Sequence, residues 1–395
     1  MSIDNDIYYK LWLNIICNHN PDLIGKSIER YGTAKEIYES KSLSRGLGVG
    51  KLRARLSTAK RSFDDARELF NYCRQNYIDI ITIDDNRYPE ILRQMHNPPQ
   101  ILYVRGKLPD VDNLVCVTIV GSRDCSDESR EFANSLATDL AKSGIVIVSG
   151  MALGIDAAAH TGALCEGNLT LAVLAGGVDV VYPKENYDIY EEIQKRGAII
   201  SERPPGCIGR SEFYTQRNRI LVGLSRGVVI VEGSKKSGTR ITANWAAMSD
   251  RDLYAVPGKP SDVRAELPNE LIKHNAKLIT SAEDIIEEYV SVYPAEIRNG
   301  IDMVLKDSHF ERLSVALPKP VKNAVPKPPE MQIDIEKYSG KQRIVLEYLR
   351  NTNEAIHIDE ISRGCGIDTT ELSFLIIQLM MERVIKEHPG GCYSL

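Results

Sequence analysis

The chain has 395 residues, of which 43% are hydrophobic and 26% are charged, and its formal net charge at pH 7 is −5. These values are those of a globular protein of two or three domains, and they argue against a protein that is basic over its whole surface. No stretch reaches the roughly 18 apolar residues of a membrane span, and the start of the chain lacks a basic leader, so we expect a cytoplasmic protein without a membrane partner.

Residues 1–110 are predicted to be mainly helical, because amphipathic stretches such as IYYKLWLNIIC and DDARELFNYCRQ are separated by Gly and Pro. Within them, GLGVGKLRARLS resembles a helix-hairpin-helix or SAM-like segment, whose glycine turn would expose backbone N–H groups to a phosphate. Lys51 and Arg53 would be accessory DNA contacts there. A plain glycine turn between packed helices, with solvated basic side chains, explains the same residues, and both interpretations stay open.

Residues 111–290 are predicted to form an α/β domain with an extended, Rossmann-like parallel sheet. Short apolar runs alternate with helical segments, and such runs are typical of strands that are buried on both faces. The runs are VTIVG, IVIVSG, LTLAVLAG, AIISE, GVVIVEG and LYAVPG.

Residues 291–337 are predicted to be an extended linker, because they contain Pro318, Pro320, Pro326, Pro328 and Pro329 with interspersed Lys.

Residues 338–395 have the pattern of a winged helix-turn-helix, with three helical segments and a Gly-containing tail. A transcription regulator would use such a domain to read DNA. However, the domain holds six Lys or Arg against eight Asp or Glu, and a helix that enters a DNA groove is normally basic. The composition therefore favours protein contact or autoregulation.

The predicted strands end on small residues, and this places an anion site at the carboxyl edge of the sheet. Gly121-Ser122-Arg123 is the sharpest element, since a glycine turn exposes amides while Arg123 offers a planar fork for phosphate. The segment from Arg203 to Arg240 contains eight Lys or Arg and two Glu, so an anionic partner would be drawn to it.

Several cofactors are disfavoured by the sequence. No GxGxxG follows the first parallel strand, and the second ends in SGMALGID rather than in an acidic residue that would hold a ribose. The eight cysteines form no CxxC pair and no Cys/His cluster at metal spacing, so we expect free thiols, no zinc site and no bound cofactor.

Across residues 80–285 a series of long motifs resembles the DNA-processing protein A (DprA, also called Smf) family. The matching segments, in order, are GSR, SGMALGIDAAAH, LAVLAGGVDVVYP, SERPPG, RNRILVGLS, VVIVEGSKKSGTRITA and AVPG. The preceding DDNRYPEIL and NPPQILYVRG resemble the family's approach to its first strand.

The resemblance implies a dimeric protein that binds single-stranded DNA, protects it, and helps to load the RecA recombinase during natural transformation, without being an enzyme. Bases would be held by stacking or loose packing, so little sequence preference is expected. By motif position, the phosphate-binding residues would be Gly121, Ser122, Arg123, Gly150, Gly154, Lys184, Arg217, Arg219, Ser237 and Thr239, with Lys235 and Lys236 as accessory contacts.

Two other interpretations are weighed against this one. The first is a nucleotide-binding or nucleotide-hydrolysing, phosphoribohydrolase-like Rossmann enzyme, which is disfavoured because this chain has AGGVDVVYP and GSKKSGTRIT in place of a PGGxGT-type loop with an acidic residue. The second is that Asp156 and His160, four residues apart, form a general acid/base pair. We expect instead that Asp156 ties its loop to backbone amides and that His160 packs against a neighbouring loop. Similarly, Glu202 and Glu232 are expected to orient basic residues, and an internal pair with either glutamate is the alternative role for the predicted phosphate-binding arginines.

Overall fold

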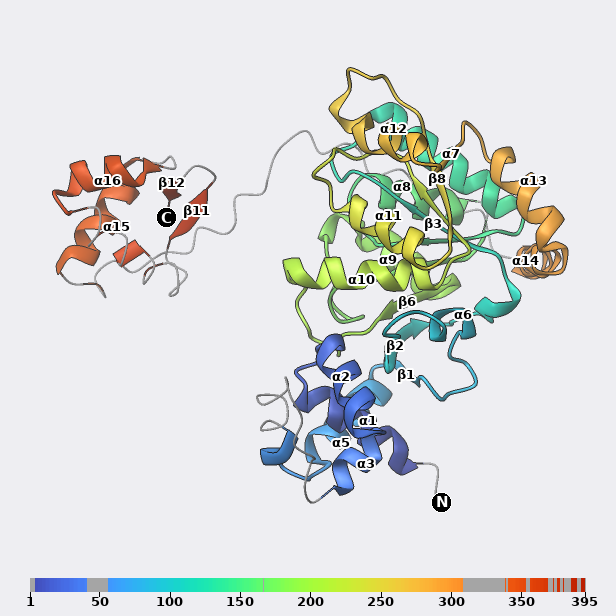
Figure 1. Ribbon diagram of the computed structural model, residues 1–395, viewed down its shortest axis with the longest axis horizontal. Helices are drawn as coiled ribbons and strands as arrows, with labels where there is room; N and C mark the ends of the chain where they lie inside the picture. Colours follow the sequence, from blue (N-terminus) through green and yellow to red (C-terminus); the bar gives the residue numbers. More distant parts are fainter. Residues whose placement is uncertain are drawn as a thin grey trace. The chain divides into compact units, whose positions relative to one another are not determined.

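The structure is a computed structural model that describes residues 4–40, 56–165, 167–307, 338, 340–352 and 356–368, together with 372, 375, 376, 379, 385–388 and 392–394 (Figure 1). The chain divides into two units, Met1–Lys319 and Pro320–Leu395, and each has a hydrophobic core. No helix among these residues is long and apolar enough to cross a membrane.

Short helices form the N-terminal part of the larger unit: α1 (Asp4–Ile16), α2 (Pro21–Tyr31), α3 (Ala34–Glu39) and α5 (Asp64–Gln75). Asn20 caps α2 by accepting a backbone hydrogen bond, and Thr33 and Glu36 form a capping box at the start of α3. Lys51 and Arg53, the predicted accessory contacts, lie outside the described residues.

A nine-stranded sheet with the order β1-β2-β6-β5-β4-β3-β7-β8-β9 forms the centre of the larger unit. From β6 to β9 in this order all neighbours are parallel, whereas β1 and β2 join antiparallel at one edge. The strands are β1 (Asp79–Thr82), β2 (Ile101–Gly106), β3 (Cys116–Val120), β4 (Val146–Ser149), β5 (Thr170–Val173), β6 (Ala198–Ser201), β7 (Gly227–Ile230), β8 (Asp252–Ala255) and β9 (Lys277–Leu278). All six predicted strand runs are confirmed, and so is the Rossmann-like fold.

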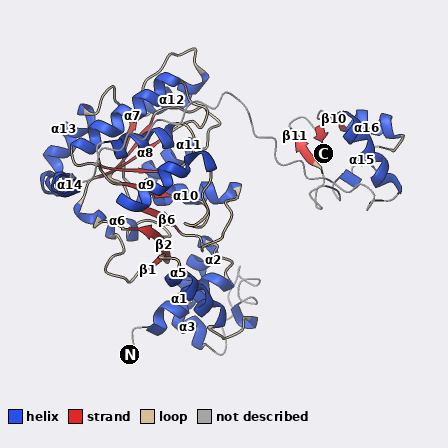
Figure 2. Cartoon of the chain, turned by 180° about the vertical axis from the view of Figure 1, so that it is seen from behind, coloured by secondary structure: helices blue, strands red, loops and turns tan. Residues whose placement is uncertain are grey.

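Helices cover both faces of this sheet (Figure 2). One face carries α7 (Asp127–Lys142), α8 (Ile155–Cys165), α9 (Tyr187–Arg196) and α13 (Glu283–Val292); the other carries α6 (Glu90–Arg93), α10 (Ser211–Gly223), α11 (Thr239–Met248) and α12 (Glu266–Lys273). Single turns of 3₁₀-helix occur at Val111–Asn113, Lys184–Asn186 and Val263–Ala265. Strands buried on both sides explain why their sequences are unbroken apolar runs.

Two features differ from the predicted boundaries. β1 and β2 precede residue 111, in the region expected to be helical, because their short sequences DIIT and ILYVRG become strands by pairing with each other and with β6. In addition, α14 (Pro294–Asp307) lies in the expected linker. This helix packs closely on the turn before β4, since a Cβ at Gly300 would stand 1.9 Å from the carbonyl oxygen of Gly144. The five linker prolines lie outside the described residues.

The smaller unit contains α15 (Gly340–Thr352), α16 (Ile358–Cys365) and a three-stranded antiparallel sheet of β10 (Ile356–His357), β12 (Cys392–Ser394) and β11 (Lys386–His388). Its core includes Val345, Leu346, Leu349, Ile361 and Leu372. Most of the third helix expected for a winged helix lies outside the described residues.

Candidate functional site

The turn after β3 carries Gly121-Ser122-Arg123 and packs against the loop after β4. A Cβ at Gly121 would stand 2.6 Å from a side-chain carbon of Ile155. One at Gly154, where φ is +77°, would stand 2.4 Å from the carbonyl oxygen of Ser122. The backbone N–H of Ile155 donates to that oxygen at 3.2 Å. The structure therefore brings Gly121, Ser122 and Gly154 together, and the close approach of the two loops requires both glycines.

Arg123 is exposed on this edge and lies over an aromatic ring. Its guanidinium carbon is 5.1 Å from the ring centroid of Tyr214, which comes from α10. Tyr214 in turn packs edge-on against Tyr182, with 6.4 Å between ring centroids. Among the described residues, no carboxylate forms an ion pair with Arg123. The Arg123 guanidinium and the rings of Tyr214 and Tyr182 thus lie in a row at this edge of the sheet, and the guanidinium is available to an anionic ligand.

Lys184 is exposed in the loop that follows β5 and the cis peptide Tyr182–Pro183. The next residue but one, Asn186, is buried and ties this loop to the loop after β4. Its side-chain amide donates to the carbonyl oxygens of Met151 at 2.8 Å and Ala152 at 3.2 Å. Lys184 therefore lies in a loop that is tied to the loop carrying Gly154.

The loop after β7 carries Lys235, Lys236, Ser237 and Thr239. Both lysines are exposed, and the Thr239 hydroxyl donates to the carbonyl oxygen of Gly121 at 3.3 Å. The Ser237 hydroxyl donates to the Thr239 hydroxyl at 2.9 Å and accepts from the Thr239 backbone N–H at 3.2 Å. Ser237 and Thr239 therefore hold this loop against the Gly121 turn, while the side chains of Lys235 and Lys236 are exposed to solvent.

Arg217 is brought to the same edge but lies beneath it, with 7% of its surface exposed. Its guanidinium occupies the space where a Cβ at Gly150 would lie, 2.1 Å from Nη1, and Nη1 donates to the carbonyl oxygen of Val173 at the end of β5. Burial lowers the pKa of Arg217, whereas the neighbouring Asp156 raises it. Gly150 is thus required by the arginine, and Arg217 supports the loop rather than reaching solvent.

Asp156 and His160 do not form an accessible acid/base pair. Asp156 accepts from the backbone N–H of Ala152 at 3.3 Å, so it ties its own loop together as expected. His160 is buried, with Nδ1 2.9 Å from the Thr170 hydroxyl on β5, and burial lowers its pKa to about 3. A histidine in this state stays neutral at pH 7 and is enclosed by protein.

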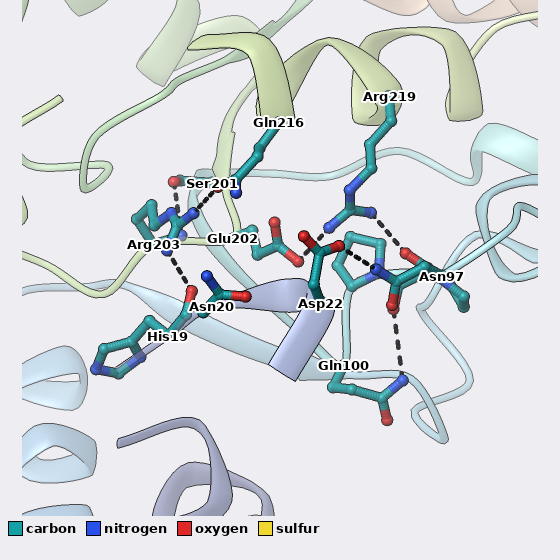
Figure 3. Close-up of polar contacts among 12 residues, drawn as sticks. His19, Asn20, Asp22, Asn97, Gln100, Ser201, Glu202, Arg203, Gln216 and Arg219 are labelled. Atoms are coloured by element: carbon teal, nitrogen blue, oxygen red, sulfur yellow. Dashed lines mark hydrogen bonds and ion pairs between the residues drawn. The ribbon is translucent and has the colours of Figure 1, made fainter. Parts of the chain in front are cut away.

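Arg219 corrects the sequence prediction, because it faces the interior and not a phosphate. Only 4% of its surface is exposed, its Nη2 pairs with Glu202 at the end of β6, and its Nη1 donates to the carbonyl oxygen of Asn97 at 2.8 Å (Figure 3). The ion pair between Arg219 and Glu202 is the internal pair that the sequence analysis gave as the alternative role for these arginines. Glu232 accepts from the backbone N–H and the hydroxyl of Ser126, at 3.2 and 2.7 Å, and so holds the residue that caps α7; in the described part of the chain it forms no ion pair with an arginine.

Four exposed cations surround these closely packed, glycine-containing loops. They are Arg123, Lys184, Lys235 and Lys236. Sequence reasoning missed the aromatic side chains among them, Tyr182, Tyr187 and Tyr214. The predicted stacking of bases named no ring, although VVYP and NYDIY place tyrosines on either side of Lys184. No group of three or more His, Cys, Asp or Glu that could hold a metal ion occurs in the described part of the chain.

Comparisons with known proteins agree on one family. Residues 79–290 match the family described as DNA recombination-mediator protein A. A DNA processing protein DprA of Bacillus subtilis is 37% identical over 215 residues, which cover 54% of this chain and 72% of that protein.

Two solved structures are also similar. That of DNA processing protein A from Streptococcus pneumoniae has a TM-score of 0.58 at 31% identity and covers 73% of this chain and 99% of the other. That of DNA processing protein A from Helicobacter pylori, whose study concerns a unique single-stranded DNA binding mode, has a TM-score of 0.50 at 30% identity, covering 54% of this chain and 97% of the other.

Proposed function

Because this chain belongs to the DNA recombination-mediator protein A family, we propose that it binds single-stranded DNA at the carboxyl edge of its large sheet. The observation that carries the proposal is the exposed Arg123, whose guanidinium carbon lies 5.1 Å from the ring centroid of Tyr214, which in turn packs edge-on against the exposed ring of Tyr182. A cation close to a solvent-exposed aromatic ring suits single-stranded DNA, because its phosphates bind cations and its bases stack on aromatic rings.

The residues divide the work between charge and stacking. Arg123, Lys184, Lys235 and Lys236 are exposed cations that would neutralise phosphates. Tyr182 would stack on a base whatever its identity, because every base has an aromatic face. The glycine turns would let backbone amides approach a phosphate closely. Arg217, Ser237 and Thr239 hold the loops in place and would act on DNA through them.

The test is binding of labelled single-stranded and duplex oligonucleotides of equal length over a series of salt concentrations. We expect clearly tighter binding of the single strand, since a duplex cannot offer unstacked bases to Tyr182. Arg298→Ala is the matched control, because Arg298 is an exposed arginine on α14 and should leave affinity unchanged. Equal or tighter binding of duplex would sink the proposal.

We also propose that the site carries out no reaction. The two groups that could have formed an acid/base pair, Asp156 and His160, are both buried and hydrogen-bonded to their own fold. Incubation with nucleoside monophosphates should release no free base. Base release that disappears in Asp156→Asn would overturn this part of the proposal.

As the family resemblance implies, we propose that the protein acts as a homodimer that protects the strand and helps to deliver it to RecA. An exposed apolar residue, Leu278, lies on the edge strand β9, where a second copy of the chain could pair. Light scattering should give twice the monomer mass, and Leu278→Glu should lower it. A monomer at micromolar concentration in the unaltered protein would contradict the dimer.

A further inference from the structure

Among the residues the structure describes, the four exposed tyrosines lie on two segments of the larger unit. Tyr72 and Tyr77 are on the last turns of α5 and the turn that follows it, with 42% and 91% of their surface exposed. Tyr182 and Tyr187 are on the loop into α9 and on its first residue, with 62% and 52% exposed. The remaining described tyrosines are buried or partly buried.

Polar contacts join these two segments. The Tyr72 hydroxyl donates to one oxygen of Asp179 at 3.0 Å, and the other oxygen of Asp179 accepts from the Gly206 N–H at 2.7 Å. Asp179 precedes Tyr182 by three residues. The end of α5 is therefore fixed against the loop that carries Tyr182.

A second link passes through Arg105 on β2. Its Nη1 donates to the Tyr190 hydroxyl at 3.0 Å and its Nη2 to the carbonyl oxygen of Asn76 at 3.4 Å. Tyr190 packs in a near-parallel arrangement with Tyr187, with 6.4 Å between ring centroids. Asn76 directly precedes Tyr77, so this arginine connects the start of α9 to the turn that presents Tyr77.

Contacts and short stretches of chain connect the exposed rings to the proposed DNA site. Arg123 lies over Tyr214, and Tyr214 contacts Tyr182. From Tyr182 the loop leads to Tyr187, and the Arg105 link leads from there to Tyr77. The rings thus form a track, which we define as Tyr182, Tyr187, Tyr72 and Tyr77, running from the Arg123 site to the N-terminal helices.

Nothing in the fold itself accounts for the exposure of Tyr77. Its φ is +55°, a left-handed conformation that is uncommon for a bulky residue, and its side chain faces solvent. Asn or Gly would suit this turn better. An exposed aromatic ring at a position that disfavours it is what a stacking contact with a ligand would explain.

The charges along the track point to stacking more than to phosphate binding. Glu185 and Asp188 are exposed near Tyr187. Near Tyr77, Arg74 is exposed and stands against Asp79, which pairs with Arg87. The track therefore carries charges of both signs and is less basic than the Arg123 site. Single strands bind such surfaces through rings on which successive bases stack. The occupant that fits is therefore the continuation of the strand already anchored at Arg123.

We propose that the tyrosine track is a second, stacking-dominated segment of the single-stranded DNA site, which extends it onto the N-terminal helical part. This inference rests on the proposed function. It implies that a strand long enough to pass beyond Tyr187 gains affinity from Tyr72 and Tyr77, and that a strand confined to the Arg123 site does not.

The test uses Tyr77→Asn in the full chain, with oligothymidylates from about 4 to 30 nucleotides. Asn tolerates the left-handed turn, so the melting temperature should not fall. Loss of one stacked base weakens binding roughly 5- to 100-fold, and we expect a loss in this range for the long strands only. The salt slope should stay unchanged, because no phosphate contact is removed.

Two further variants complete the design. Tyr77→Phe keeps the ring and should bind as the unaltered protein does. Met248→Ala removes another large, exposed apolar side chain, on α11, and should leave the affinity for single strands unchanged.

Each result has a defined meaning. An unchanged affinity for long strands, or an equal loss for short and long strands, overturns the track while leaving the proposed function standing. Failure of the unaltered protein to bind any single strand overturns the proposed function itself.

Discussion

The basic residues of the larger unit occur in two opposite environments. At the carboxyl edge of the sheet, Arg123 is exposed, packs on Tyr214 and faces solvent beside Lys184. At the junction between α10, β6 and the N-terminal helices, Arg203 and Arg219 are buried and saturated with partners from the protein (Figure 3). The difference teaches that local net charge identifies a region, whereas exposure and partners decide which cation can meet a ligand.

The junction is a structural connection between the two parts of the larger unit. Arg203 donates to the backbone carbonyl of His19, between α1 and α2, and to the side chain of Gln216 on α10. Its guanidinium carbon also lies 4.0 Å from the ring centroid of Phe213. Only 4% of the Arg203 surface is exposed and its two terminal nitrogens both bind protein groups, so this arginine is not available to DNA.

The largest effect is expected at Arg219. Arg219→Ala would leave Glu202 buried without its counter-charge, which costs about 3–5 kcal/mol of unfolding free energy. Urea denaturation should show this loss. The double variant with Glu202→Gln should recover part of it, and the salt slope of DNA binding by the folded protein should not change. Stability close to that of the unaltered protein, together with a flatter slope, would move Arg219 into the interface.

A smaller loss of unfolding free energy is expected at Arg217, which lies at the carboxyl edge of the sheet like Arg123 but is buried like Arg203 and Arg219. Arg217→Ala removes the donor to the Val173 carbonyl and the cation beside Asp156, which should cost about 1–3 kcal/mol. Affinity for single strands should fall because the Gly150 loop loses its support. The melting temperature should fall with it. A salt slope flattened as much as by loss of Arg123, in a variant of full stability, would show that Arg217 contacts phosphate directly.

The junction should also be sensitive to pH. Burial, helped by Arg203, lowers the pKa of His19 to about 4, from about 6.5 in the unfolded chain. The folded state therefore favours the neutral ring, and this stabilisation is fully present above pH 6.5 and is lost as the pH falls from 6.5 towards 4. The slope contributed by one such group is at most about 1.4 kcal/mol per pH unit.

His19→Asn is the variant that isolates this effect. Asn tolerates the φ of +52° at this position, and the backbone carbonyl that binds Arg203 remains. Unfolding free energies measured at pH 7.5 and 5.5 should differ less in this variant than in the unaltered protein. An identical difference in both proteins would mean that His19 is not the group that titrates.

Much of the fold could be predicted from the sequence, because a parallel sheet imposes apolar runs that end on small residues. The six runs from VTIVG to LYAVPG became β3 to β8, and the glycines at 121, 150 and 154 lie where loops or side chains approach too closely for a Cβ. β1 and β2 were missed because they lie outside the alternation of apolar runs and helices that marks the parallel sheet, and the pairing of β1 with β2 and of β2 with β6 is a tertiary contact.

The site was predicted less completely for a similar reason. Arg217 and Arg219 are two residues apart on α10, about 200° around the helix, so one points to the β4 and β5 ends while the other points to Glu202. A motif does not reveal that division. Nor does a motif reveal which of the 18 tyrosines are exposed. The position of Tyr182 depends on its contact with Tyr214 on α10 and on the hydrogen bond from Asn186 to the loop before α8, and both partners are distant in sequence.

The most direct test of the central claim is the salt dependence of single-stranded DNA binding by Arg123→Ala, with Arg298→Ala as the control. Each phosphate neutralised on a single strand contributes about −0.7 to the slope of log K against log salt, so losing Arg123 should flatten the slope by roughly that amount for any base sequence. The melting temperature should stay unchanged, because the side chain is exposed. An unaltered slope in a protein that melts earlier would contradict the assignment of Arg123 to phosphate.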